Sequence, residues 1–166
     1  MIRLGLFLAA FFLCATYAYK VGGQPERAAI TAQGFALIIT LSTELLRGSV
    51  TFSFLVWGWL VADTLLIFML IALALRANRI WTMVLAGLQL AAIFAHVAKA
   101  LYPQLPPLAY ALFLQFWGWP MLVCTMAGTL NHRSRVLRGV SQPEWKPRII
   151  MFAGQTEAPH VPLRRS

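Results

Sequence analysis

The sequence predicts an all-α bundle of five transmembrane helices, with the N-terminus outside the membrane and the C-terminus inside. Of its 166 residues, 60% are hydrophobic and 11% are charged, whereas a soluble domain carries about a quarter charged residues. Five apolar stretches have the roughly 20-residue length that spans a hydrocarbon core about 30 Å thick. They place residues 1–131 in one membrane domain and leave residues 132–166 as a basic tail.

The first helix is expected over residues 2–19. With Arg3 ahead of it, this stretch also resembles a secretory signal peptide. We interpret it as an uncleaved helix, because cleavage and alternating spans would leave the basic tail outside. Gly5 and Ala9 give it a face of small residues suited to close helix packing.

A turn is expected next over residues 20–27, because Gly22, Gly23 and Pro25 interrupt a helix. The second helix is expected over residues 27–46. One of its faces, at the 3-4 spacing of an α-helix, carries Gln33, Leu37, Thr40, Glu44 and Arg47.

The third helix is expected over residues 51–75 and carries Asp63. At a rise of about 1.5 Å per residue, Asp63 lies roughly 17 Å from the helix start, near the middle of the membrane. A tight basic turn leads to the fourth helix over residues 80–101. That helix has a stripe of small residues and a neighbouring polar stripe. The stripe of small residues consists of Gly87, Ala91 and Ala95. The polar stripe consists of Gln89, Ala92, His96 and Lys99.

The fifth helix is expected over residues 108–130 and carries Gln115. Pro107 suits the first turn of this helix. The tail after it, residues 132–166, is basic and contains prolines, so we expect it to be mostly disordered and attracted to anionic lipid.

The distribution of cations predicts the orientation. Half of the 14 Lys and Arg residues follow His132. If the tail lies inside, eleven cations lie inside and three lie outside, which the positive-inside rule favours. The three outside would be Arg3, Arg47 and Lys99.

Several polar residues fall within the apolar stretches, where placing them costs most. The candidates for an intramembrane polar site are Asp63, His96, Gln89, Gln115, Glu44 and Lys99. Their predicted depths are compatible with one cavity that opens outward. A carboxylate near mid-bilayer costs about 2.5–3.5 kcal/mol on insertion scales and tends to mark ion or proton routes. Histidine changes charge near neutral pH and suits a proton relay. In the alternative interpretation, Asp63 is protonated or bonds Gln89 and only joins two helices.

Other classes of function are disfavoured. The +9 net charge is explained by orientation, and no nucleic-acid-binding motif accompanies it. The sequence has no nucleophile–base pair, no phosphate-binding loop and no recognised metal-ligand spacing. We therefore predict no enzyme activity, no metal and no cofactor. Cys14 and Cys124 are interpreted as small buried apolar residues.

Three motifs and one histidine carry a resemblance to known proteins. These are GGQPER at 22–27, LRANRIW at 75–81, LQL at 88–90, and His96. Together they resemble small multi-pass inner-membrane proteins of Gram-negative bacteria, over roughly residues 15–130. The resemblance implies a bacterial inner-membrane location and the topology above, and it implies no activity.

Two hypotheses for function remain. The first is a non-enzymatic accessory or structural membrane component, packed against itself or within a larger complex. The alternative is a small oligomeric transporter or channel that moves protons, ions or a small solute through a polar cavity around Asp63 and His96.

Overall fold

The structure, a computed structural model, describes residues 2–47, 57–104, 106–140 and 143–145. These residues form five α-helices. The helices are α1 (Ile2–Val21), α2 (Gln24–Arg47), α3 (Trp57–Arg76), α4 (Ile80–Leu101) and α5 (Pro107–Leu137).

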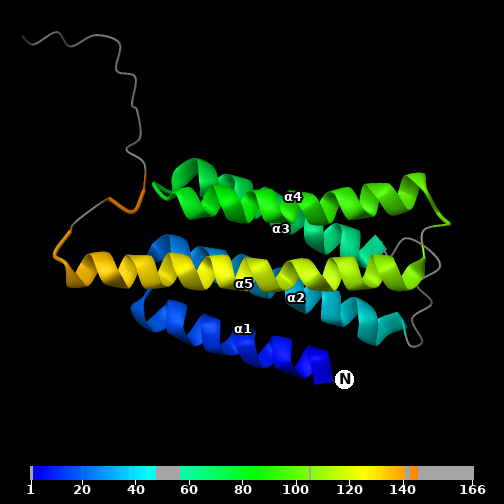
Figure 1. The fold of residues 1–166 in the computed structure, drawn as a ribbon, viewed down its shortest axis with the longest axis horizontal. Coiled ribbons are helices and arrows are strands. Elements are labelled where there is room, and N and C mark those ends of the chain that lie inside the picture. Colours follow the sequence, from blue (N-terminus) through cyan, green and yellow to red (C-terminus); the bar gives the residue numbers. More distant parts are fainter. Residues whose placement is uncertain (1, 48–56, 105, 141–142, 146–166) are drawn as a thin grey trace, which may run out of the picture.

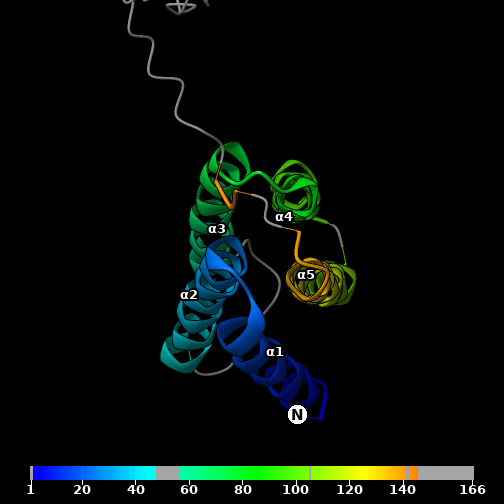
Figure 2. The ribbon, with the colours of Figure 1, turned by 90° about the vertical axis from the view of Figure 1, so that its left-hand side faces the viewer.

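The helices run up and down, side by side, along the long axis of the molecule (Figure 1). Viewed from one end, they form a ring in chain order, with α5 closing on α1 (Figure 2). Helix α2 also touches α5 across the ring. The α1–α2 and α3–α4 turns and the end of α5 lie at one end of the bundle, here called the tail end. The start of α1 and the α4–α5 turn lie at the opposite end.

All five described helices are long and apolar enough to cross a membrane. This agrees with the predicted all-α class and the number of spans. Large apolar side chains also remain exposed on their outer faces, including Phe12, Phe68, Phe94, Phe116 and Val123. Because water solvates such a surface poorly, the exterior suits a lipid environment.

The turn between α1 and α2 is shorter than expected. Helix α1 continues to Val21, and α2 already begins at Gln24. Pro25 lies in the first turn of α2, where its missing N–H has no helical partner to lose. Gly22 is needed at the turn, because a Cβ there would lie 2.5 Å from the Ala18 carbonyl oxygen. The expected first residues of the third helix, 51–56, lie outside the described residues.

Helix α5 extends to Leu137, beyond the expected end at residue 130. Residues 143–145 then return to the tail end of the bundle. The Gln24 amide donates to Glu144 Oε2 at 3.2 Å, and the Asn78 amide donates to the Glu144 carbonyl oxygen at 3.1 Å. Trp145 forms an isolated β-bridge with Ala77. The start of the predicted disordered tail is therefore helical and residues 143–145 are docked, whereas 146–166 lie outside the described residues.

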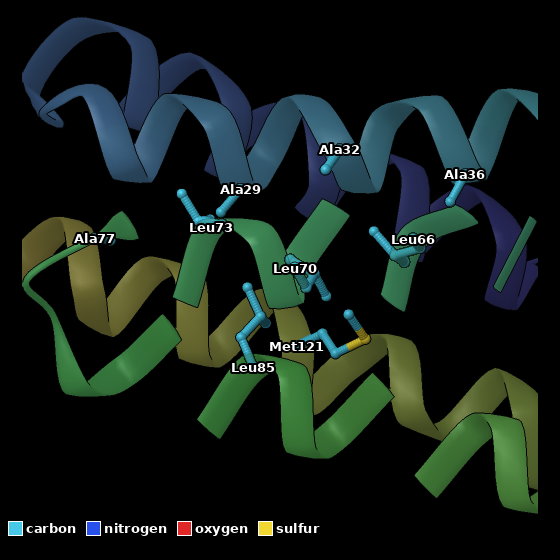
Figure 3. Close-up of a cluster of buried hydrophobic side chains, with 9 residues drawn as sticks. All are labelled: Ala29, Ala32, Ala36, Leu66, Leu70, Leu73, Ala77, Leu85 and Met121. Atoms are coloured by element: carbon cyan, nitrogen blue, oxygen red, sulfur yellow. The ribbon is translucent and has the colours of Figure 1, made fainter. Parts of the chain in front are cut away.

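The main apolar core joins α2 and α3 (Figure 3). Alanines of α2 at 3-4 spacing face leucines of α3 at the same spacing. They are Ala29, Ala32 and Ala36 on α2, and Leu66, Leu70 and Leu73 on α3. Small side chains let the two helix backbones approach closely. Gly5 and Gly87 belong to the small-residue faces that were expected to pack closely against other helices. Within the described residues these two positions are open, because a Cβ on either glycine would meet no atom within 4 Å.

Candidate functional site

Asp63 of α3 lies between two side chains of α4. Its Oδ2 is 2.8 Å from His96 Nε2, and its Oδ1 accepts a hydrogen bond from Gln89 Nε2 at 2.9 Å. Gln89 and His96 are seven residues apart, which is two helical turns, so both point to the same neighbour. The His96 side chain is 1% exposed and the Asp63 side chain 24%. The carboxylate is therefore held on both oxygens and still reaches accessible space.

Tyr110 of α5 extends this chain. Its hydroxyl lies 2.7 Å from His96 Nδ1, and its side chain is fully buried. With a neutral imidazole, Tyr110 donates to Nδ1 and the Nε2–H donates to Asp63. With an imidazolium, both ring N–H groups donate, to Tyr110 and to Asp63. Both protonation states keep every contact, so His96 can gain or lose a proton without rearrangement.

A cavity of about 150 Å³ lies beside Asp63, and described residues of α1 to α5 all contribute to its wall. Asp63 is the one charged side chain among these described lining residues. The other polar side chains include Gln33, Thr40 and Gln89, and most of the remaining wall is apolar. The cavity therefore combines one negative group with an apolar surface.

The polar chain follows a gradient of depth. Tyr110 lies within the first turn of α5, about 5 Å along the axis from its start, and His96 lies about 8 Å from the end of α4. Asp63 is about 9 Å from the start of described α3. Each distance is counted from the end of its own helix, and these three helix ends all lie on the side of the bundle opposite the tail end. The hydrogen-bonded chain thus leads from near that end toward the cavity.

The six predicted site residues do not all gather at this site. Asp63 and Gln89 line the cavity, and His96 lies behind Asp63. Lys99 is 3% exposed and its Nζ donates to the Pro103 carbonyl oxygen at 2.9 Å. Glu44 is half-buried near the end of α2, and Gln115 is exposed.

Gln115 and Glu44 lie outside the cavity wall for two different reasons, the rotation of α5 and the position along α2. Leu114, Trp117, Gly118 and Met121 of α5 face the cavity. Gln115 follows Leu114 by one residue and is turned about 100° away from it. Glu44 shares the face of Gln33 and Thr40 but lies one turn farther along the helix, beyond the cavity wall. Glu44, Gln115, His96 and Lys99 are therefore not among the described residues that line this cavity, although their predicted depths were compatible with it.

Three contributing residues were missing from the predicted site. Gln33, already placed on the same helical face as Leu37 and Thr40, lines the cavity with both of them. Its Nε2 donates to Thr125 Oγ1 of α5 at 2.7 Å. Tyr110 and Trp117 were the other two. Counting residues from Pro107 would have placed Tyr110 at the depth of His96, but its direction depends on the rotation of α5.

A second buried polar cluster lies at the tail end. Glu26 of α2 is fully buried, and neither of its carboxylate oxygens accepts a hydrogen bond from a described residue. Arg135 of α5 is attracted electrostatically by Glu26 and repelled by Arg79. None of the three lines the cavity. This cluster joins α2, the α3–α4 turn and α5.

The chemistry open to the Asp63 site is the binding of a proton or a cation. A carboxylate beside an apolar cavity favours a positive partner, because an uncompensated charge there is costly. Within the described residues, no group of three or more His, Cys, Asp or Glu side chains is arranged to hold a metal ion. Comparison with known protein families, with curated proteins and with solved structures gives no match.

Proposed function

We propose that this protein is a small multi-pass protein of a bacterial inner membrane that moves protons or small cations through the Asp63 site. One observation carries the proposal. The Asp63 carboxylate is held by His96 and Gln89 at the wall of a cavity to which all five described helices contribute. A group that only joined two helices would need no such space beside it.

The proposed orientation places the tail end in the cytoplasm. Lys20, Arg27 and Arg76 lie at helix ends there, together with the basic end of α5. The positive-inside rule favours this arrangement, and the basic tail would meet anionic lipid. The chain from Tyr110 through His96 to Asp63 would then begin near the outer surface.

The proposed mechanism uses Asp63 as the binding group and His96 as the relay. A proton arriving from the outer side is taken up by the imidazole and passed through Nε2 to Asp63 Oδ2. Protonation of the carboxylate removes the charge that holds a cation in the cavity. A proton and a cation therefore compete for the same group, the carboxylate of Asp63.

The test is flux in liposomes with Asp63→Asn and Glu44→Gln as matched acid-to-amide variants. We expect Asp63→Asn to abolish proton or cation flux while keeping the oligomeric state and thermal stability of the parent protein. Glu44→Gln, outside the cavity wall, retains flux. Absence of flux by the parent protein across a panel of cations and pH gradients would refute the transport role.

A non-enzymatic accessory role is the second candidate. It is favoured by Gly5 and Gly87, which are exposed and have open space where a side chain would begin, since an added Cβ would meet no atom within 4 Å. Such surfaces let another helix approach closely, either from a second copy or from a larger complex. Native mass spectrometry of protein extracted gently from its own membrane tests this role. A defined complex with another protein, lost on Gly5→Leu, would support it, and a lone monomer would contradict it.

A further inference from the structure

We infer that the cavity beside Asp63 takes a small organic monocation, such as a protonated primary amine with an apolar body. The inference rests on the proposed function, because both use Asp63 as the binding group. It adds the charge, size and chemical character of the bound molecule.

The charge follows from the balance of groups around the cavity. Asp63 is the charged residue of the wall, and the described lining residues of α1, α2 and α5 are all uncharged. The titratable groups facing Asp63 are His96 of α4 and, behind it, Tyr110 of α5. With the His96 imidazole neutral, a low-dielectric site with one carboxylate is neutralised by one positive charge. Additional positive charge would be left uncompensated.

The carboxylate is already oriented to receive a cation. Gln89 donates to Oδ1 and His96 contacts Oδ2, and each carboxylate oxygen has a further lone pair to offer. Because these contacts fix the side chain, little conformational entropy is lost when an ammonium group binds.

The size and walls favour an organic cation over an inorganic ion. A cavity of about 150 Å³ accommodates a benzene-sized molecule. Side-chain oxygens come only from Asp63, Gln33, Thr40 and Gln89 among the described lining residues. Apolar residues such as Phe11, Leu66 and Met121 cover most of the rest and cannot replace the hydration shell of a metal ion. They can instead contact the apolar body of an amine.

Trp117 supplies a second recognition element. Its side chain lines the cavity, and its indole N–H finds no hydrogen-bond acceptor among the described residues. An indole face attracts an ammonium or its adjacent methylene groups more strongly than a phenyl face does. Trp117 therefore favours a cationic ligand independently of Asp63.

The experiment measures binding of benzylammonium, with neutral benzyl alcohol as the size-matched control. Purified protein in detergent is titrated with each compound by calorimetry. We expect saturable binding of one benzylammonium per chain and much weaker binding of benzyl alcohol. Asp63→Asn should weaken benzylammonium binding by about tenfold to hundredfold, which is the usual range for a lost hydrogen bond to a charged group. Asp63→Glu and Glu44→Gln, which keep a charged site, should retain measurable binding.

Two matched pairs locate the ligand. A Cβ on Gly118 would lie 3.0 Å from the Phe7 ring, and both residues line the cavity, so Gly118→Ala should weaken binding. Gly87→Ala adds the same methyl group in open space and should leave it unchanged. Trp117→Phe should weaken binding about threefold through the poorer cation–π contact. Trp57→Phe, at a side chain that is 70% exposed, should have no effect.

The outcomes separate this inference from the transport role. Equal binding of benzyl alcohol and benzylammonium would overturn the inference. Unchanged benzylammonium binding by an Asp63→Asn variant that keeps the thermal stability of the parent protein would overturn it as well. So would displacement of benzylammonium by millimolar Na⁺ or K⁺, which would show an inorganic ion site. Asp63-dependent proton flux without benzylammonium binding would leave the transport role standing and reject the organic cation. Binding without any flux would support the cation site and reject transport.

Discussion

Asp63 and Glu26 are both carboxylates inside the same bundle, but their surroundings differ. Asp63 has a side-chain partner for each oxygen and is 24% exposed beside a cavity. Glu26 is fully buried at the tail end, and no described residue donates a hydrogen bond to its carboxylate. Its carboxylate interacts electrostatically with Arg135 of α5.

The difference shows why burial alone does not identify a binding site. Glu26 is the more buried acid, but it lies away from the cavity wall. Its negative charge interacts favourably with Arg135 of α5. Asp63 is more accessible and already oriented, so it can exchange partners. We therefore expect stability to depend mainly on Glu26, and binding and transport to depend mainly on Asp63.

The largest expected effect on stability is that of Glu26→Gln. The variant keeps the shape of the side chain and removes the negative charge that interacts with Arg135. We expect the free energy of unfolding to fall by about 3 kcal/mol, because Arg135 loses a favourable electrostatic interaction and a charged group inside the bundle is costly without compensation. An unfolding titration in SDS measures it. Glu44→Gln makes the same change at the other end of α2 and should cost little. If Glu26→Gln lost benzylammonium binding without losing stability, the contrast between the two carboxylates would fail.

Tyr110→Phe should have the next largest effect. It removes the hydroxyl from His96 Nδ1 and leaves a buried ring nitrogen without that partner, at a cost of about 1–2 kcal/mol. Proton flux should slow, whereas benzylammonium affinity should stay unchanged. Tyr19→Phe is the control, because the Tyr19 hydroxyl bonds Thr31 on the exposed surface. Loss of amine affinity in Tyr110→Phe would show that the chain fixes the ligand site and is more than a relay.

Gly23→Ala tests the contact of the returning segment with the tail end. The new methyl group would collide with Glu144 Oε1 and lie 2.9 Å from His132 Cε1. We expect residues 143–145 to shift and stability to fall by about 1 kcal/mol, typical of a lost hydrogen bond. Faster hydrogen exchange at the Gln24 and Asn78 amides would report it, with Gly87→Ala as the control. Unchanged exchange at both amides would contradict the docking.

The smallest expected effect is that of Thr125→Val. Gln33 loses its acceptor but keeps the cavity beside it, where a water molecule can replace the hydroxyl. We expect a loss of about 0.6 kcal/mol, the average for an interhelical polar contact in membrane proteins. Thr129→Val is the control, since that hydroxyl bonds the Thr125 carbonyl of its own helix. A loss equal to that of Glu26→Gln would mean that Gln33 is a structural group rather than part of the cavity wall.

The helices themselves were largely predictable from the sequence. Their number follows from apolar stretches of spanning length, and α4 has the expected bounds of 80–101. The start of α2, near Pro25, and the end of α5, at Leu137, were less predictable. Proline is compatible with the first turn of a helix, and the end of α5 is polar enough to resemble a tail although it remains helical.

The contents of the candidate site were only partly predictable. Gln89 and His96 share a stripe of one helix, and the sequence placed Asp63 within reach of Gln89. Whether Asp63 contacts Gln89 and His96 depends on how α3 and α4 are rotated against one another. The position of Tyr110 behind His96 depends in the same way on the rotation of α5. Gln115 and Glu44 lie at suitable depths, but their rotation or position removes them from the cavity wall.

The sequence by itself determined the all-α class and the number of apolar helices of spanning length, because hydrophobic length acts along the chain and needs no neighbour. It also determined which polar groups are costly to bury. Only the tertiary structure decided which carboxylate faces a cavity and which is fully buried at the tail end. Alanines on α2 let α3 pack closely, and this packing sets the rotation that brings Asp63 to His96 and leaves an accessible space at its side.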